Sequence, residues 1–311
     1  MKIAFLADPL SGFKTYKDST YAMMAEAAKR GHHIHAFEQK DMALESGRVT
    51  AEVKRIELTG DAHDWYRIKE TRVVGLQEFD AVVMRKDPPF DMEYIYATYL
   101  LELAGTQGAR IFNKPGAIRS HNEKLTIAQF PELTVPTLVT SDAARLRAFH
   151  AEHKEVILKP LDGMGGAGIF RVTEDGMNLG SIIETLTHNG TRTIMVQRYI
   201  PEIVDGDKRV LLIGGKVVPF SLARIPQGGE VRGNLAAGGR GEARPLTARD
   251  RAIGEALAPA LMARGLLLVG LDVIGDYLTE VNVTSPTCFQ EIAQQTGFNV
   301  AGMFIDAIEN S

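Results

Sequence analysis

The sequence predicts two architectures in succession: an α/β first third built on a parallel sheet, and an α+β remainder with mostly antiparallel sheets. In residues 1–121, short apolar segments alternate with helical segments, which is the pattern of strand–helix–strand units. From residue 122 onward, several strand-like segments follow one another across glycine turns, which is typical of hairpins. The chain has 311 residues, enough for two or three packed units.

Each element of the first third has a local signal. Asp18 or Ser19 can cap a helix that stops at Gly31. A buried strand is broken by Pro88-Pro89. The first strand-to-helix turn lacks the G-x-G-x-x-G pattern, so it gives no support for a dinucleotide site. We expect strands at 2–7, 33–37, 79–89 (broken at its end by the two prolines) and 109–113, with helices at 18–31 and 93–108.

The remainder begins with a capped helix and a strand–glycine loop–strand unit. A hairpin turning at Gly214-Gly215 follows, then a long glycine-rich stretch, a helix, a second hairpin and closing helical segments. We expect the helices at 139–153 and 247–265, and strands or hairpins at 155–172, 193–201, 208–225 and 270–286.

The composition excludes several classes of protein. The formal net charge is −4, so no strong basic field favours nucleic acid or anionic lipid. No apolar run has the length of a membrane span, and the first strand-like segment does not resemble a signal peptide. Cys288 is the single cysteine, which rules out an intrachain disulfide and favours a reducing cytoplasm.

A glycine loop follows the strand that ends at Lys159. The stretch "LKPLDGMGGAGIF" contains Gly163, Gly165, Gly166 and Gly168, and such a loop can bring backbone N–H groups close to phosphate oxygens. It is not a Walker loop, because the lysine precedes the glycines. Taken alone, the motif favours a hairpin turn with a surface lysine, and the neighbouring features shift the interpretation toward phosphate binding.

The hairpin "GLDVIGDYLTEVNVTSP" contains two carboxylates and a carboxamide among aliphatic residues. If the loop holds an odd number of residues centred on Asp276, Asp272 pairs with Glu280 and Gly270 pairs with Asn282. The polar residues then share one face and the aliphatic residues the other, so the hydrophobic pattern favours the odd loop. Opposed carboxylates repel unless a cation lies between them, and oxygen ligands with open positions suit Mg²⁺. The alternative is a solvated polar face.

Taken together, these stretches resemble the ATP-grasp ligases and, within them, the prokaryotic glutathione synthetases. The similarity covers almost the whole chain. It rests on "MRKDPPFD", "NEKL", "ILKPLDGMGGAGIFR", "DGDKRVL", "ARIPQGGEVRGNLAAGGRGE", "GLDVIGD" and "TEVNVTSPT". It implies an ATP-grasp fold with an N-terminal Rossmann-like domain at 1–121, a central subdomain at 122–200 and a C-terminal subdomain at 201–311.

The resemblance also implies roles for particular residues. Two lysines and the glycine loop would hold the ATP phosphates. A linker would meet adenine, partly through its backbone, and one acid would contact ribose. The hairpin would bind magnesium or manganese, and arginines would hold the peptide carboxylate and the transferring phosphoryl group. The phosphate-binding residues would be Lys124 and Lys159, with Gly163, Gly165 and Gly166. The adenine linker would be Gln197, Tyr199 and Ile200, and the ribose-binding acid would be Asp207. The metal ligands would be Asp272, Glu280 and Asn282, and the arginines would be Arg209, Arg224 and Arg232.

The implied reaction joins γ-glutamylcysteine to glycine with ATP, through an acyl phosphate, in a cytoplasmic homotetramer. Because acyl phosphates hydrolyse, the site must exclude water, and residues 226–241 are a candidate lid containing Arg232 and Arg240. Cys288 fits a small apolar residue near the site better than a nucleophile.

Two other functions remain open on the sequence alone. One is a different ATP-grasp carboxylate–amine ligase, such as a D-alanine ligase or a glutamate-adding enzyme. The other is an ATP-binding protein without catalysis, although the full set of lysines and acids argues against it.

Overall fold

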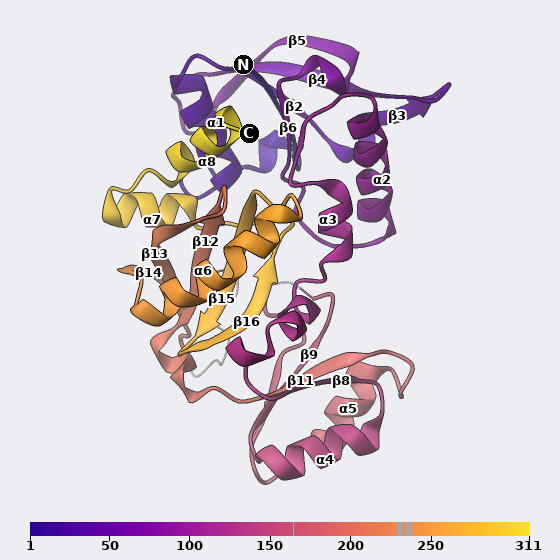
Figure 1. Ribbon diagram of the computed structural model, residues 1–311, viewed down its shortest axis with the longest axis vertical. Coiled ribbons are helices and arrows are strands. Elements are labelled where there is room, and N and C mark those ends of the chain that lie inside the picture. The colour runs from indigo at the N-terminus through magenta and orange to yellow at the C-terminus, as the bar shows by residue number, and fades with distance from the viewer. Residues whose placement is uncertain (164, 229–232, 234, 236–237) are drawn as a thin grey trace.

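The computed structural model describes residues 1–311 except 164, 229–232, 234 and 236–237. Three sheets follow one another along the long axis of the molecule (Figure 1). The N-terminal sheet lies at one end and the sheet of the middle section lies at the other end. The sheet of the C-terminal section lies between them, so the end of the chain occupies the centre of the molecule.

The N-terminal sheet is mixed. Its central strands are parallel in the order β2-β1-β6-β7, as the alternating pattern predicts. A long antiparallel extension, which the sequence analysis did not identify, adds β4 beside β2 and places β3 and β5 along β4. The strands are β1 (Lys2–Leu6), β2 (His33–Phe37), β3 (Met42–Glu45), β4 (Arg48–Leu58), β5 (Tyr66–Gly75), β6 (Ala81–Met84) and β7 (Ile111–Phe112).

Helices cover both faces of this sheet. The helix α1 (Ser19–Lys29) packs through Met23, Met24 and Ala27 on the face that carries Ile3 and Phe5. Its first turn is capped by the Asp18 carboxylate, which accepts a hydrogen bond from the Tyr21 amide at 2.8 Å. The helix α2 (Met92–Thr106) packs on the opposite face, and α3 (Pro115–Ser120) lies beside it.

The middle section has its own sheet and its own core. The sheet is entirely antiparallel, in the order β10-β9-β11-β8. One face is covered by α4 (Ala143–His153) and α5 (Leu179–Thr187), whose apolar residues form a separate cluster with those of the sheet. The strands are β8 (Thr137–Thr140), β9 (Val156–Pro160), β10 (Phe170–Val172) and β11 (Ile194–Arg198).

The third sheet, again antiparallel, has the order β14-β13-β12-β15-β16. Its strands are β12 (Asp207–Ile213), β13 (Lys216–Ile225), β14 (Arg240–Pro245), β15 (Leu268–Ile274) and β16 (Tyr277–Asn282). The helices of this section are α6 (Ala248–Ala263), α7 (Phe289–Thr296) and α8 (Val300–Glu309). The predicted antiparallel character of the second part is therefore confirmed.

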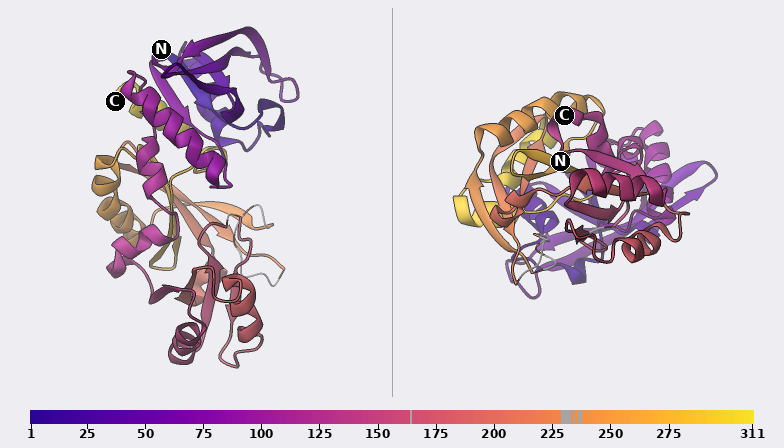
Figure 2. Two further views of the ribbon diagram at one scale, coloured as in Figure 1. Left: turned by 90° about the vertical axis from the view of Figure 1, so that its right-hand side faces the viewer. Right: turned by 90° about the horizontal axis from the view of Figure 1, so that it is seen from below.

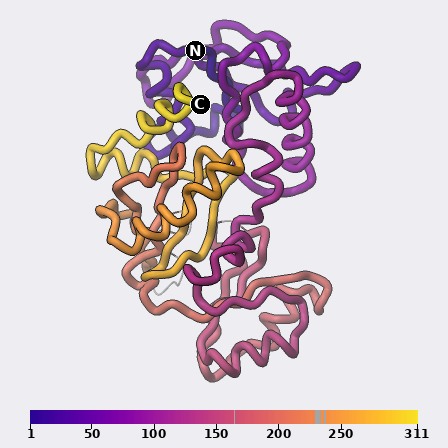
Figure 3. The backbone as a smooth tube through the Cα atoms, in the orientation of Figure 1, coloured from indigo at the N-terminus to yellow at the C-terminus, as the bar shows by residue number. Residues whose placement is uncertain are grey.

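The two ends of the chain lie side by side (Figure 3). Arg30, just after α1, forms ion pairs with Asp306 at 2.6 Å and Glu309 at 2.9 Å on α8. The N-terminal and C-terminal sections also share two apolar clusters, the first of which includes Met195 of β11, whereas the third cluster is confined to the middle section. The N-terminal and C-terminal sections therefore form one packed body, and the middle section is attached to it (Figure 2). Among the described residues, no helix is both long enough and apolar enough to span a bilayer.

Asn113 joins the N-terminal and C-terminal sections through its buried side chain. Its amide nitrogen donates to the carbonyls of Leu268 at 2.7 Å and Val283 at 3.0 Å, and its oxygen accepts from the Leu268 amide at 2.9 Å. A single carboxamide thus satisfies backbone groups at the start of β15 and just after β16.

We expect Asn113→Ala to lower the free energy of unfolding by at least about 1–3 kcal/mol, because it leaves buried backbone groups without partners. Chemical denaturation followed by circular dichroism measures the change. Asn310→Ala is the matched control, since the Asn310 side chain bonds a carbonyl at the exposed chain end, and its effect should stay within about 0.5 kcal/mol. Equal effects of the two substitutions would contradict this role of Asn113.

Candidate active site

The hairpin of β15 and β16 places its polar side chains as the sequence pattern predicts, but by a different turn. Asp272 pairs with Glu280 and Gly270 pairs with Asn282, as expected. The turn itself is a two-residue one, because Ile274 pairs with Tyr277; the expected odd loop around Asp276 is wrong. The extra residue is instead a bulge at Thr279, whose hydroxyl donates to the Asp272 carbonyl at 3.1 Å. The bulge restores the register that separates the polar face from the aliphatic face.

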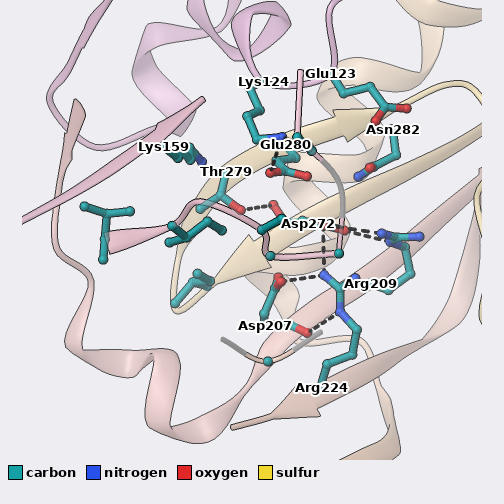
Figure 4. A pocket seen from close by; sticks show the side chains of 18 of the residues that line it. Glu123, Lys124, Lys159, Asp207, Arg209, Arg224, Asp272, Thr279, Glu280 and Asn282 are labelled. Atoms are coloured by element: carbon teal, nitrogen blue, oxygen red, sulfur yellow. Dashed lines mark hydrogen bonds and ion pairs between the residues drawn. The ribbon is translucent and has the colours of Figure 1, made fainter. Parts of the chain in front are cut away.

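Asp272 is a buried carboxylate shared between two arginines. Arg209 donates to it through Nε at 2.7 Å, and an Nη of Arg224 lies 2.9 Å from its second oxygen (Figure 4). Arg224 also donates to Asp207 at 2.5 Å. The side chains come from three adjacent strands, in directly paired registers: Arg224 with Asp207, and Arg209 with Asp272.

These neighbours set the ionisation of both acids. Burial opposes ionisation of Asp272, but the charges of Arg209 and Arg224 outweigh it and hold the pKa of Asp272 below its usual range. Asp207 is different, because burial and the nearby Asp272 charge raise its pKa to about 6 despite Arg224. Gly270 leaves room for this cluster: a Cβ there would come within 3.0 Å of the Arg209 side chain.

The two predicted phosphate-binding lysines face the same space from other elements. Lys124 follows α3 in the chain, and its Nζ donates to the Gly163 carbonyl at 2.6 Å and lies 3.5 Å from Glu280. Lys159 is at the end of β9 and is 5% exposed, and burial lowers its pKa. Lys124 therefore joins the glycine loop of the middle section to the hairpin of the C-terminal section.

One cavity of about 320 Å³ brings the predicted residues together between the middle and C-terminal sections. Every predicted site residue that the structure describes lines it. These are Lys124, Lys159, Gly163, Gly165, Gly166, Gln197, Tyr199, Ile200, Asp207, Arg209, Arg224, Asp272, Glu280 and Asn282.

Residues 229–232, 234 and 236–237 of the expected lid lie outside the described residues. Arg232 is among these undescribed residues, so its predicted role is not addressed by the structure. Within the candidate lid at 226–241, Gly233 and Leu235 line the cavity. A Cβ on Gly233 would come within 2.1 Å of the Arg224 carbonyl, so this position requires glycine. Arg240, at the start of β14, pairs with Glu242 at 3.2 Å.

The segment at the end of β11, residues 197–200, also lines the cavity. The Gln197 side chain is buried and donates to the Thr137 hydroxyl at 2.9 Å. Tyr199 is fixed by its amide, which donates to the Glu155 carbonyl at 2.9 Å, and by the Arg171 guanidinium 4.0 Å from its ring centre. Aliphatic residues that the sequence analysis did not select line the cavity too: Ile157, Ile169, Ile203 and Ile274.

Glu123 is a further residue of the site that the sequence analysis missed. Its carboxylate accepts hydrogen bonds from the amides of Val283 at 3.0 Å and Thr284 at 3.3 Å, and from the Thr284 hydroxyl at 2.9 Å. Its carbonyl accepts from the Val281 amide at 2.8 Å. Glu123 thereby holds the edge of β16 beside Lys124. Its sequence signal was its place in the stretch "NEKL", next to the predicted Lys124.

The wall near the N-terminal section is formed by the segment after β16. Ser285 contacts Asp87, and the Pro286 carbonyl accepts from the buried Arg85 at 3.0 Å. Cys288 is buried at the cavity, and burial raises the pKa of its thiol. This agrees with its prediction as a small apolar residue near the site.

The residues present fit a hard divalent cation. Among the described residues, no three His, Cys, Asp or Glu side chains are grouped to hold a metal alone, and the hairpin offers two carboxylates and one carboxamide. The Asn282 amide nitrogen bonds the Gly270 carbonyl at 3.2 Å, which leaves its oxygen as the available ligand atom. An incomplete oxygen set suits Mg²⁺, which keeps water and phosphate in its shell.

Comparisons of the fold place the chain in a class. The D-cycloserine synthetase DcsG superposes with a TM-score of 0.70 at 18% identity, covering 99% of both chains. An ATP-grasp ligase, PsnB, solved with a minimal precursor, Mg and ADP, gives a TM-score of 0.63 at 18% identity and covers 99% of this chain and 97% of its own. At such identities the likeness shows the fold alone, which is that of the ATP-grasp ligases.

The sequence comparisons identify the family within that class. The model of the prokaryotic glutathione synthetase N-terminal domain matches residues 1–119, and that of the prokaryotic glutathione synthetase ATP-grasp domain matches residues 123–297. A glutathione synthetase of Ralstonia nicotianae is 68% identical over 311 residues, covering 100% of this chain and 96% of the relative. One from Bordetella parapertussis is 60% identical over 318 residues, covering 100% and 99%. The chain belongs to the prokaryotic glutathione synthetase family.

We expect Glu123→Ala to lower the free energy of unfolding by at least about 1–3 kcal/mol, because the donors of Val283 and Thr284 lose their acceptor. Glu123→Gln keeps an acceptor oxygen and should restore most of the stability. Urea denaturation of the three proteins measures both effects. If the two variants lose the same stability, the charge of Glu123 matters and the hydrogen bonds do not.

Proposed function

We propose that this chain catalyses the ATP-dependent joining of γ-glutamylcysteine to glycine, giving glutathione, ADP and phosphate. The observation that carries the proposal is the convergence of both lysines, the glycine loop and the polar hairpin on one cavity, in a chain that matches glutathione synthetases over its whole length. Phosphoryl transfer depends on positioning and charge neutralisation more than on a protein nucleophile, and this cavity supplies cations and oxygen ligands.

The cavity divides into two ends with different chemistry. The aliphatic residues and the linker of Gln197, Tyr199 and Ile200 form an apolar slot that suits adenine, and Asp207 is our candidate for ribose. We assign the phosphates to Lys124, Lys159 and the glycine loop, which line the same cavity. This division supports ATP lying with its base toward the middle section and its phosphates toward the hairpin.

We assign Asp272, Glu280 and Asn282 as the ligands of magnesium or manganese. When bound, such an ion would neutralise charge on the phosphate oxygens. The chain's own residues do the remaining work. Arg209 and Arg224, together with Arg232, are the candidates for holding the peptide carboxylate near the γ-phosphate and for neutralising charge as the phosphoryl group moves.

The chemistry itself has two steps. A carboxylate oxygen of the dipeptide attacks the γ-phosphorus and ADP leaves, which produces an acyl phosphate. The glycine amine then attacks the acyl carbon, loses a proton and displaces phosphate. Water would destroy the intermediate, so we also propose that residues 226–241 close over it. The positions of Gly233 and Leu235 at the cavity support this.

We further propose three units at 1–121, 122–200 and 201–311, and a homo-oligomer of four copies that acts in the cytoplasm. The separate core of the middle section supports the division. The free, buried thiol of Cys288 suits a reducing compartment.

The proposal is tested by measuring ADP and peptide product with purified protein, ATP and magnesium, while substrates are omitted one at a time. We expect ADP and glutathione in equal amounts only when γ-glutamylcysteine and glycine are both present. Product formation from two D-alanine molecules or from glutamate would favour another ligase of this fold. ATP binding without turnover of any pair would favour a non-catalytic protein.

We expect Glu280→Gln to lower turnover by more than about 10–100-fold, the loss that follows removal of a residue supporting a metal ligand. ADP affinity should fall in magnesium and change little when the metal is chelated, because the variant keeps the lysines and the adenine slot. Titration calorimetry measures the affinities. Glu184→Gln, an exposed substitution on α5, is the control. Near-normal turnover of Glu280→Gln at ordinary magnesium would reject this assignment.

A further inference from the structure

A second cavity lies in the N-terminal section, and none of the residues described as lining it lines the larger cavity of the candidate active site. Its volume is about 230 Å³. Lys2 and His33, the first residues of β1 and β2, place it near the amino ends of the parallel strands, at the end of the molecule that carries the N-terminal sheet (Figure 1). The cavity is lined by Lys2, His33, His35, Val53, Arg55, Glu70, Arg72, Val74, Glu78 and Phe79.

The floor of this second cavity is apolar and packed. Val53, Val74 and Phe79 are buried and belong to an apolar cluster that the N-terminal and C-terminal sections share. The His35 ring lies against this floor, with its centre 5.0 Å from that of the Phe79 ring. Its Nδ1 lies 3.3 Å from the His33 carbonyl, which leaves Nε2 as the nitrogen that can bind a ligand. The imidazole is therefore held in place before a ligand arrives, which lowers the entropy cost of binding.

Four basic residues line the cavity in two cross-strand pairs. Lys2 of β1 pairs with His33 of β2, and His35 of β2 pairs with Arg55 of β4. His33 and His35 are two residues apart in one strand, so all four side chains belong to the same face of the sheet. Like charges in directly opposed positions destabilise a sheet. When the histidines are protonated, an anion that lies between the two pairs therefore stabilises this arrangement.

The acids at this cavity contact a different residue. Glu70 and Glu78 both line the cavity, and their carboxylates lie 3.6 Å and 3.9 Å from the Arg72 guanidinium. Arg55 pairs in register with Glu70. Neither Arg55 nor Lys2, however, forms an ion pair within the part of the chain that the structure describes. The positive charges of Lys2 and Arg55 are therefore available to a ligand.

We propose that this cavity binds a phosphate group between Lys2, His33, His35 and Arg55. Arginine binds phosphate through its planar fork and lysine binds it as a point charge. A phosphate offers acceptor oxygens on several sides, so donors from three strands can each reach one, whereas the two oxygens of a single carboxylate would leave some of these donors without acceptors. The proposal stands apart from the chemistry of the larger cavity. Free inorganic phosphate and a phosphate monoester carry the same group.

Protonation of His35 should accompany binding. In the free chain, burial lowers the pKa of this imidazole, and the charges of Arg55, His33 and Lys2 lower it further. A bound dianion raises the pKa of His35, so binding takes up a proton. The contribution of His35 to the affinity is therefore present at low pH and is lost as pH rises through the pKa of the bound state. The other charged groups at the cavity are Arg72, Glu70 and Glu78, together with Asp80, which accepts from the Lys2 amide at 2.6 Å.

The first experiment is titration calorimetry with inorganic phosphate, with ADP and magnesium present to occupy the larger cavity. Arg55→Met removes the guanidinium and keeps a side chain of similar length, so the phosphate affinity should fall at least about tenfold, the loss of one charge-assisted hydrogen bond. Lys54→Met is the matched control, because Lys54 is the neighbouring residue of β4 and faces the opposite side of the sheet. Its effect on the affinity should stay below about twofold. Turnover should persist in both variants.

Two further titrations complete the test. Glycerol phosphate replaces inorganic phosphate in one of them: equal or tighter binding identifies a phosphate monoester as the ligand, and weaker binding identifies free phosphate. The other repeats the phosphate titration near neutral pH in two buffers that differ in their heat of ionisation, which measures the protons taken up. The native chain should take up more protons on binding than His35→Asn, whereas a loss of affinity caused by altered structure would not change this number.

Three results would overturn the proposal. The native chain binds neither phosphate nor glycerol phosphate when ADP and magnesium are present, or Arg55→Met binds phosphate as tightly as the native chain does, or His35→Asn takes up as many protons as the native chain. Should Arg55→Met fail to fold, Lys2→Met replaces it, because Lys2 is exposed at the start of β1. Unchanged affinity in Lys2→Met would then reject the site.

Discussion

The buried Asp272 carboxylate, held between Arg209 and Arg224, is the interaction on which the rest of the site depends. A buried charge without a partner is costly, and removing one member of such a cluster leaves the others uncompensated. Here the partners come from β12 and β13, so the charge can be neutralised only when three strands are in the observed register. The pairing of β15 with β16 in turn places Glu280 opposite Asp272. The stability of the C-terminal sheet and the geometry of the cavity thus rest on the same ionic contacts.

Glu280 and Lys124 form a longer and more exposed ion pair beside this buried cluster. Their contact is longer, at 3.5 Å, and the Glu280 side chain is 19% exposed against 4% for Asp272. Lys124 also bonds the Gly163 carbonyl, a neutral group that a phosphate oxygen can replace with a gain in electrostatic energy. In the proposed role of Lys124, nucleotide binding would exchange the partners of this lysine without breaking the cluster around Asp272. Under this proposal, a site with several charges would accept an anion and keep its fold.

The sequence was sufficient for the parts of the fold that depend on local pattern. Alternation in the hairpin predicted the pairing of Asp272 with Glu280, because any other register would bury acids among valines. It did not predict the bulge at Thr279, since a two-residue turn plus a bulge and an odd loop give the same faces. The extension of β3, β4 and β5 was missed as well. Its exposed strands, such as Tyr66–Gly75 with many charged residues, have little of the alternation that predicts a buried sheet.

The site residues also divide into those that the sequence indicated and those that only the structure revealed. Charged residues such as Lys159 and Asp207 stand out in a sequence when they lie in or next to strand-like segments. The family resemblance then implied a binding role for each of them. Ile157 and Ile274 line the cavity equally, but an isoleucine in a strand is the expected residue for any core, so its sequence carries no sign of a binding role. Glu123 was missed for a third reason. It acts through backbone amides that are 158 or more positions away in the chain, and no local pattern records such a contact. What sequence reasoning finds first is therefore charge that folding must neutralise, and what it leaves to the structure is the apolar and positioning part of the same site.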